Sequence, residues 1–155
     1  MAAKDLKYFM RPQEERTITA PGPASITDGD GNVIELEIKI ISQEEIERIN
    51  KMYEERGVAS DKKGRPLINS GEVVFKTKRD TARAIRHMIA EALVYPNLKD
   101  KGLMEYYKCV DISEMALKVF KSSDEYAHVS RIVLNAIGIL DDLDDDDDTV
   151  EEAKN

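Results

Sequence analysis

The chain has 155 residues, the size of one domain, and its 41% hydrophobic and 35% charged residues predict a folded body with a strongly charged surface. The formal net charge of −8 belongs entirely to residues 141–155, which hold seven Asp, two Glu and one Lys, so residues 1–140 are neutral and body-wide attraction to nucleic acid is excluded. A single cysteine excludes an intrachain disulfide, and no apolar run reaches the roughly 18 residues of a membrane span.

Two alternating runs near the N-terminus predict a β-hairpin. Residues 16–19 and 33–41 alternate apolar and polar side chains, which is the period of a strand with one wet face. The run Asp-Gly-Asp-Gly-Asn at 28–32 lies between them and is a turn signal. It also imitates the start of a calcium-binding loop, but Val33 and Lys39 stand where that loop needs Gly and Glu. A hairpin turn is therefore favoured.

Helical patterns occupy most of the remaining body. Ser42 can cap a first helix that Gly57 ends, a polar loop follows at 58–71, and residues 72–77 suit a short strand. A helix is predicted at 78–94, because apolar residues recur at helical spacing up to Pro96, which stops it.

Three more helical patterns complete the body. A short helix is predicted at 103–108, one capped by Asp111 follows, and the last runs from Ser123 to Gly138. The predicted fold is α+β and mostly helical: a small N-terminal β-hairpin or sheet followed by a compact bundle of about four to five helices. Residues 1–140 are predicted to be a single domain and residues 141–155 a disordered acidic tail, because like charges repel and little can be buried there.

Residues that could carry catalysis do not form a known constellation. His87 and His128 lack a second His or Cys at metal-ligand spacing, and the neighbours of Cys109 favour an inert buried thiol. No glycine-rich phosphate loop occurs. The sequence therefore predicts no enzyme, no catalytic residues, no metal site and no cofactor.

The acidic tail and a basic stripe form the one charge pattern with two interpretations. Arg79, Arg83 and Arg86 share the polar face of the predicted helix. They are either a solvated helix face or a contact for phosphate or a partner. The tail is either a solubilising appendage or a segment that rests on this stripe and screens it until a partner arrives.

The segment from about residue 33 to residue 138 resembles a known family. Residues 89–100, Ile-Ala-Glu-Ala-Leu-Val-Tyr-Pro-Asn-Leu-Lys-Asp, resemble the helix and Pro-x-Leu-x-Asp turn of XkdN-like phage tail assembly chaperones. Further matches in the family's order are Leu103, Tyr106, Glu114, Leu117, Phe120, Glu125, Tyr126, Ile137 and Gly138. A strand that leads directly into the cap at Ser42 is also similar. The insertion around Pro21 and the Asp-rich end depart from the pattern.

The resemblance implies a chaperone that binds the tape measure protein during tail morphogenesis in the bacterial cytoplasm and is absent from the mature virion. The tail tube protein and a second copy of the chain are further candidate partners, whereas nucleic acid and membranes are not. The partner-binding residues expected are those of the turn and short helix, together with the stripe: Tyr95, Pro96, Leu98, Leu103, Tyr106, Arg79, Arg83 and Arg86. The alternative for the first five is that they only pack one helix onto the next.

A second function class is compatible with the charge pattern. A regulatory protein-binding module could present the acidic tail as a nucleic-acid mimic. That function predicts salt-dependent binding to a basic partner that is lost with the tail, whereas a chaperone keeps its partner on residues 1–140.

Overall fold

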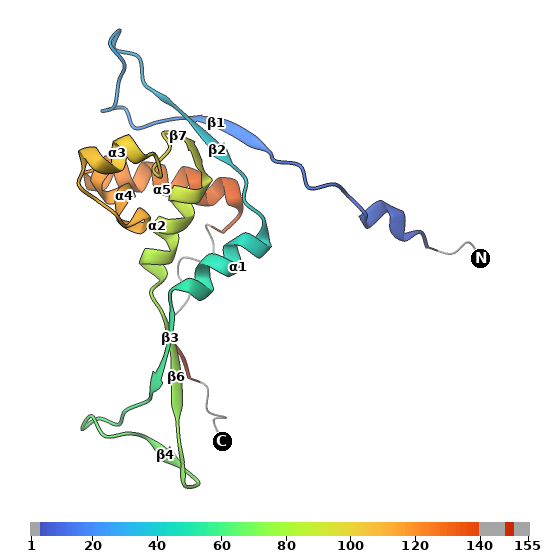
Figure 1. The fold of residues 1–155 in the computed structure, drawn as a ribbon, viewed down its shortest axis with the longest axis vertical. Helices are drawn as coiled ribbons and strands as arrows, with labels where there is room; N and C mark the ends of the chain where they lie inside the picture. The colour runs from blue at the N-terminus through green and yellow to red at the C-terminus, as the bar shows by residue number, and fades with distance from the viewer. Residues whose placement is uncertain (1–3, 140–147, 151–155) are drawn as a thin grey trace.

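A three-stranded antiparallel sheet packs against the helices in the computed structural model, which describes residues 4–139 and 148–150 (Figure 1). β1 (Thr17–Pro21) pairs with β2 (Glu35–Lys39), and β2 also pairs with β7 (Leu93–Tyr95). Leu36 and Ile38 of β2 are buried while Glu35 and Glu37 are exposed. This period of two is what a sheet with one covered face requires.

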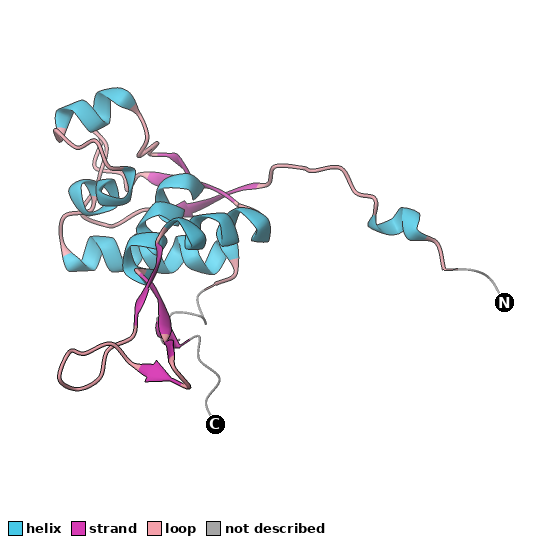
Figure 2. Ribbon diagram, turned by 60° about the horizontal axis from the view of Figure 1, so that its bottom comes forward, coloured by secondary structure: helices cyan, strands magenta, loops and turns pink. Residues whose placement is uncertain are grey.

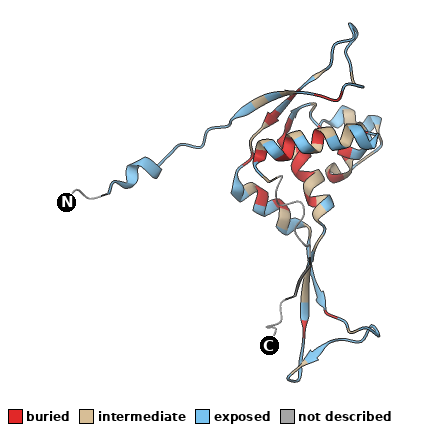
Figure 3. Cartoon of the chain, turned by 180° about the vertical axis from the view of Figure 1, so that it is seen from behind, coloured by how far each residue is buried: buried red, intermediate tan, exposed pale blue. Residues whose placement is uncertain are grey.

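Five α-helices lie within the part of the chain that the structure describes, and they form the body. They are α1 (Gln43–Met52), α2 (Thr81–Ala92), α3 (Lys101–Tyr106), α4 (Ile112–Val119) and α5 (Ser123–Ile137). α2 contacts α1, α4 and α5, and its Ala84, Met88 and Ile89 are fully buried between them. The buried residues gather around α2 and under β2 (Figure 3). α2 is therefore the centre of the core.

The helix ends follow the capping signals of the sequence. The Ser42 side chain accepts a hydrogen bond from the backbone N–H of Glu45 at 3.1 Å, and the Asp111 side chain accepts one from Ser113 at 3.0 Å. Ser122, one residue before the predicted start of α5, forms a capping box with Glu125. Gly138 ends α5 with a φ of 83°, a conformation that glycine adopts without strain.

A long two-stranded arm, residues 54–79, projects from the body between α1 and α2 (Figures 1 and 2). β3 (Glu54–Val58) pairs with β6 (Phe75–Arg79), and the short strands β4 (Ile68–Asn69) and β5 (Glu72–Val73) pair near the far end. β8 (Asp148–Val150) pairs with the other side of β6. At the base of the arm, the N–H of Asp80 donates a hydrogen bond of 3.0 Å to the carbonyl of Tyr53.

The N-terminal segment extends away from the body and carries the short 3-10 helix η1 (Leu6–Phe9) (Figure 1). The segment ends where β1 begins. Among the residues that the structure describes, no helix is long and apolar enough to cross a bilayer.

The predicted architecture of an N-terminal hairpin followed by a helical bundle is wrong, although β1 and β2 do pair as the hairpin requires. Strands occur along the whole described chain, in three sheets. The predicted helix at 78–94 is divided: its first residues belong to β6, and its last form β7 against β2. Gly57, predicted to end the first helix, lies within β3. The predicted disordered tail lies outside the described residues, except for 148–150 in β8.

Candidate functional site

The turn between α2 and α3 is held rigidly by local hydrogen bonds. The Asn97 side chain accepts a hydrogen bond from the N–H of Lys99, and the Asp100 side chain caps α3 by accepting one from Leu103 at 3.0 Å. The ammonium of Lys99 lies 2.9 Å from the Glu91 carboxylate, which ties the turn back to α2. These contacts join the turn to both α2 and α3.

The five residues predicted in this turn and helix lie in one continuous segment but face different ways. Leu98 is fully buried, and Leu103 packs partly buried against the core. Tyr95 ends β7 half-exposed, and Pro96 joins it through a cis peptide bond. Tyr106, at the end of α3, is 76% exposed. Tyr95 and Tyr106 are thus the two members open to a partner.

A groove of about 650 Å³ lies beside this segment, and we call it the α3 groove. Lys108 adopts a φ of 51° after α3, and the N–H of Cys109 donates back to the carbonyl of Met104 at 3.0 Å. This turn leaves Val110 95% exposed. The residues that line the groove are Lys99, Lys101, Met104, Glu105, Lys108, Cys109 and Val110.

The α3 groove is lined mainly by apolar and basic side chains. Met104, Cys109 and Val110 are apolar side chains, and three of the other four lining residues are lysines. Long methionine side chains adapt to irregular apolar surfaces. Met104 and Val110 were not predicted as binding residues. The one sign of a binding surface in the sequence was Val110, an apolar residue directly before a helix cap.

The predicted arginine stripe joins α2 to the start of α4. Arg83 donates from Nη2 to Asp111 Oδ2 at 2.5 Å and from Nε to Ser113 Oγ at 3.0 Å. Arg86 donates from Nε to the carbonyl of Ser113 at 2.8 Å and from Nη2 to Glu114 at 3.2 Å. The hydrogen bonds from Ser113 and then those from Arg83 hold the pKa of Asp111 below its ordinary value. These contacts stabilise the α2–α4 pair.

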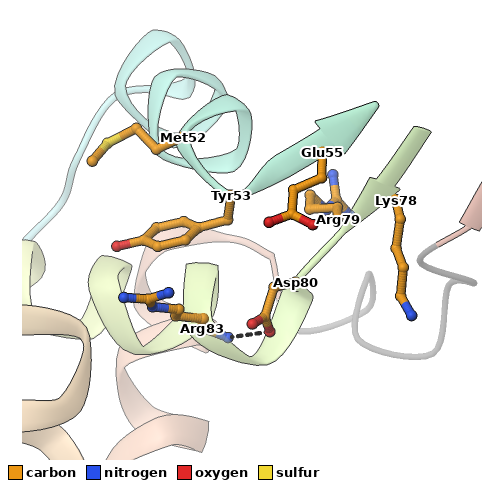
Figure 4. A pocket seen from close by; sticks show the side chains of 7 residues that line it. All are labelled: Met52, Tyr53, Glu55, Lys78, Arg79, Asp80 and Arg83. Carbon is orange, nitrogen blue, oxygen red and sulfur yellow. Dashed lines mark hydrogen bonds between the residues drawn. The ribbon is translucent and has the colours of Figure 1, made fainter. Parts of the chain in front are cut away.

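Arg79 lies on β6, whereas the other two predicted arginines lie on α2. It lines a cavity of about 630 Å³ at the base of the arm, where Tyr53 lies over Arg83 (Figure 4). The lining residues are Met52, Tyr53, Glu55, Lys78, Arg79, Asp80 and Arg83. The cavity mixes both signs of charge. The structure therefore brings Arg79 near Arg83 and separates the stripe from the turn that carries Tyr106.

A second apolar surface lies on the arm. Its exposed apolar side chains are Val58, Leu67, Ile68, Val73 and Phe75. Arg56 lies over the ring of Phe75, with its guanidinium carbon 4.5 Å from the ring centre. The α3 groove and the arm thus both present apolar side chains to a partner, as does η1, where Leu6, Tyr8 and Phe9 are exposed.

His87 is buried within α2 against α1. Its Nδ1 lies 2.6 Å from the Tyr53 hydroxyl, and its Nε2 lies 3.5 Å from a Glu91 carboxylate oxygen. Burial lowers the pKa of His87 below its ordinary value, while Glu91 acts in the opposite direction. No group of three or more His, Cys, Asp or Glu side chains within residues 4–139 and 148–150 could hold a metal ion.

The buried His87 makes stability depend on pH near neutrality. The unfolded chain binds a proton at His87 below about pH 6.5, whereas the folded protein resists it. Stability is therefore full above that pH and falls as pH decreases, by at most about 1.4 kcal/mol per pH unit for one proton. We expect the melting temperature to fall more between pH 7.5 and 5.5 in the natural protein than in His87→Gln. His128 is present in both proteins, and equal pH slopes would contradict the prediction.

Comparisons with known proteins agree on one family. Residues 6–154 match the family described as phage XkdN-like tail assembly chaperone protein. The chain is 31% identical over 153 residues to the phage-like element PBSX protein XkdN of Bacillus subtilis strain 168, covering 97% of this chain and 94% of that protein. It is 32% identical over 143 residues to the uncharacterized protein YqbN of the same strain, covering 91% and 89%.

A solved structure has the same fold. The crystal structure of the protein YqbN superimposes with a TM-score of 0.64 and 24% identity, covering 88% of this chain and 98% of that chain. The family match extends beyond the segment 33–138 in which the resemblance was found, and the added residues include η1, β1 and β8.

Proposed function

Because the chain belongs to the XkdN-like phage tail assembly chaperone family, we propose that it binds the tape measure protein during tail morphogenesis and is absent from the finished tail. In this proposal it works in the cytoplasm of the bacterial host and catalyses no reaction. Tape measure proteins are long, apolar and helical, and such surfaces aggregate when they are left uncovered. A chaperone must cover them until the tube assembles.

The α3 groove is the surface that we assign to this partner, and the exposure of Val110 is the observation that carries the assignment. An amphipathic helix binds by placing its apolar face in such a groove. Met104, Cys109 and Val110 offer apolar contacts in the groove, and the lysines that line it suit acidic side chains on that helix. Tyr106 lies at the end of α3 with its ring largely exposed.

A partner that covers Val110 gains binding free energy from the apolar area that it buries. Full burial of a valine side chain is worth about 1.5–3 kcal/mol, and 1.4 kcal/mol corresponds to a tenfold change in affinity. Val110 gains little of this burial free energy in the isolated chain, because it is almost fully exposed. A carboxylate at this position would be desolvated by the partner instead.

We expect Val110→Glu to lower the affinity for the tape measure protein about tenfold or more without changing the melting temperature. The measurement is co-expression of the tagged chain with the tape measure protein, followed by quantitative co-purification and by sedimentation of the uncaptured partner.

The matched control is Ile68→Glu, which places the same charge on the exposed apolar surface of the arm. Ile68→Glu should leave co-purification unchanged. If Val110→Glu keeps the partner and Ile68→Glu loses it, the arm and not the α3 groove is the binding surface. Mass spectrometry of purified tails tests the second part of the proposal, since the chain should not be found there.

A further inference from the structure

The outer side of β6 is covered by the C-terminal end of the chain. β6 is the central strand of a three-stranded sheet, with β3 on one side and β8 on the other. Lys76, Thr77 and Lys78 pair antiparallel with Val150, Thr149 and Asp148 respectively. β8 follows α5 in the chain, whereas β6 lies in the middle of the sequence. Two segments far apart in the sequence thus share one backbone ladder at the base of the arm (Figure 1).

The two segments carry opposite charge. β6 contains Lys76, Lys78 and Arg79 and no acidic residue. The whole arm, residues 54–79, has seven basic and four acidic residues, a net charge of +3, while residues 141–155 carry −8. Opposite net charges favour the encounter of two segments in a manner that salt weakens.

An edge strand displays a row of unpaired N–H and C=O groups that another extended chain can join. Without β8, β6 would be such an edge, in an arm that has only one other long strand. Extended peptides bind sheet edges in this way, through main-chain hydrogen bonds. β8 spans only three residues, so its hold on β6 is short enough to be exchanged for another strand.

We propose that the outer edge of β6 is a binding site for an extended acidic segment, and that the chain's own residues 148–150 fill it. A tethered segment competes with a free one through its effective concentration, which is on the order of millimolar for a short linker. A free acidic strand therefore binds this edge with a dissociation constant at or below about 1 mM once the tail is displaced. This site goes beyond the proposed function and uses residues that the α3 groove does not contain.

Two prolines in β8 test the pairing within the full chain. Ladder hydrogen bonds alternate along an antiparallel pair, so Asp148→Pro with Thr149→Pro removes a ladder donor whichever of the two residues supplies it. The matched control, Asp148→Ala with Thr149→Val, loses the same single charge and keeps both N–H groups. Hydrogen exchange of the β6 amides should rise about tenfold in the proline variant only, with α2 unchanged. Equal exchange in the two variants would overturn the proposal.

Binding from solution tests the chemistry of the occupant. A labelled peptide with the sequence of residues 141–155 should bind the proline variant saturably, about tenfold more tightly than it binds the control variant. A peptide of the same composition in scrambled order should bind more weakly, because strand pairing depends on the order of the residues. Scrambling leaves the net charge of the peptide unchanged. Equal binding of both peptides would mean attraction by charge alone and would reject a strand-addition site. Neither result bears on Val110→Glu, so the two proposals fail separately.

Discussion

Replacing Leu98 with alanine is expected to lower the free energy of unfolding by about 2–5 kcal/mol. Leu98 is fully buried and belongs to the core cluster that includes α2, although it lies in a turn. Truncation removes its apolar area and leaves a cavity that the rigid turn between Asn97 and Asp100 cannot close by moving. Urea denaturation followed by circular dichroism measures the change.

Leu117→Ala is the matched control for this experiment. Leu117 loses the same atoms from a helix, but it is 41% exposed. Its truncation should cost less than half as much. If Leu98→Ala and Leu117→Ala are equally mild, the turn is not anchored in the core. It then does not hold the α3 groove in place.

Arg86→Ala is the second substitution with a large expected effect, about 1.5–3 kcal/mol of stability. The Arg86 side chain is only 17% exposed, and its guanidinium reaches both the carbonyl of Ser113 and the carboxylate of Glu114. Ser113 is fully buried, so removing the donor leaves little water to replace it. The melting temperature and the denaturation midpoint should both fall.

Two controls separate geometry from charge at Arg86. Arg86→Lys keeps the charge but not the fork of donors, so it should recover only part of the loss. Arg131→Ala removes the same group from an exposed position on α5 and should change stability by less than about 0.5 kcal/mol. Equal effects of Arg86→Ala and Arg131→Ala would mean that the α2–α4 contacts contribute nothing measurable.

Local signals in the sequence located most helices and the first strand pair. Ser42 and Asp111 mark helix starts because a side-chain oxygen there accepts a backbone N–H, which is chemistry within a few residues. Gly138 marks an end for an equally local reason. Alternation in β2 predicted its buried face, because that face is covered by the core.

Only part of the arm was predicted: residues 72–77, expected to form a short strand, lie largely in β5 and β6, whereas β3 was not predicted. Every residue of β3 is exposed, so no apolar alternation distinguishes it from a loop. β7 was predicted as the end of a helix, because Leu93 continues the apolar spacing of α2. Its pairing with Ile38 of β2 overrides that local preference, and residues 55 positions apart leave no mark on a local pattern.

The candidate site was predicted as one set of residues, and the structure divides it. Arg83 and Arg86 were predicted on the polar face of their helix from local spacing alone. The residues that contact them lie at 111–114, too far along the chain for local spacing to reveal the contacts. Tyr106 is as open as a surface residue should be, while Leu98 is interior. The part that these eight residues play in partner binding stays a prediction. The groove beside them depends on the backbone turn after α3. The spacing of apolar residues in the sequence does not predict that turn.

The hydrogen bond between the Asp80 N–H and the Tyr53 carbonyl closes the base of the arm, so the chain leaves and re-enters the body at adjacent points. Segments inserted at such a junction can be lengthened, shortened or exchanged while the flanking helices keep their packing. The arm therefore forms one unit: a designer could change its length or tip sequence, or transplant it, while the flanking helices keep their packing.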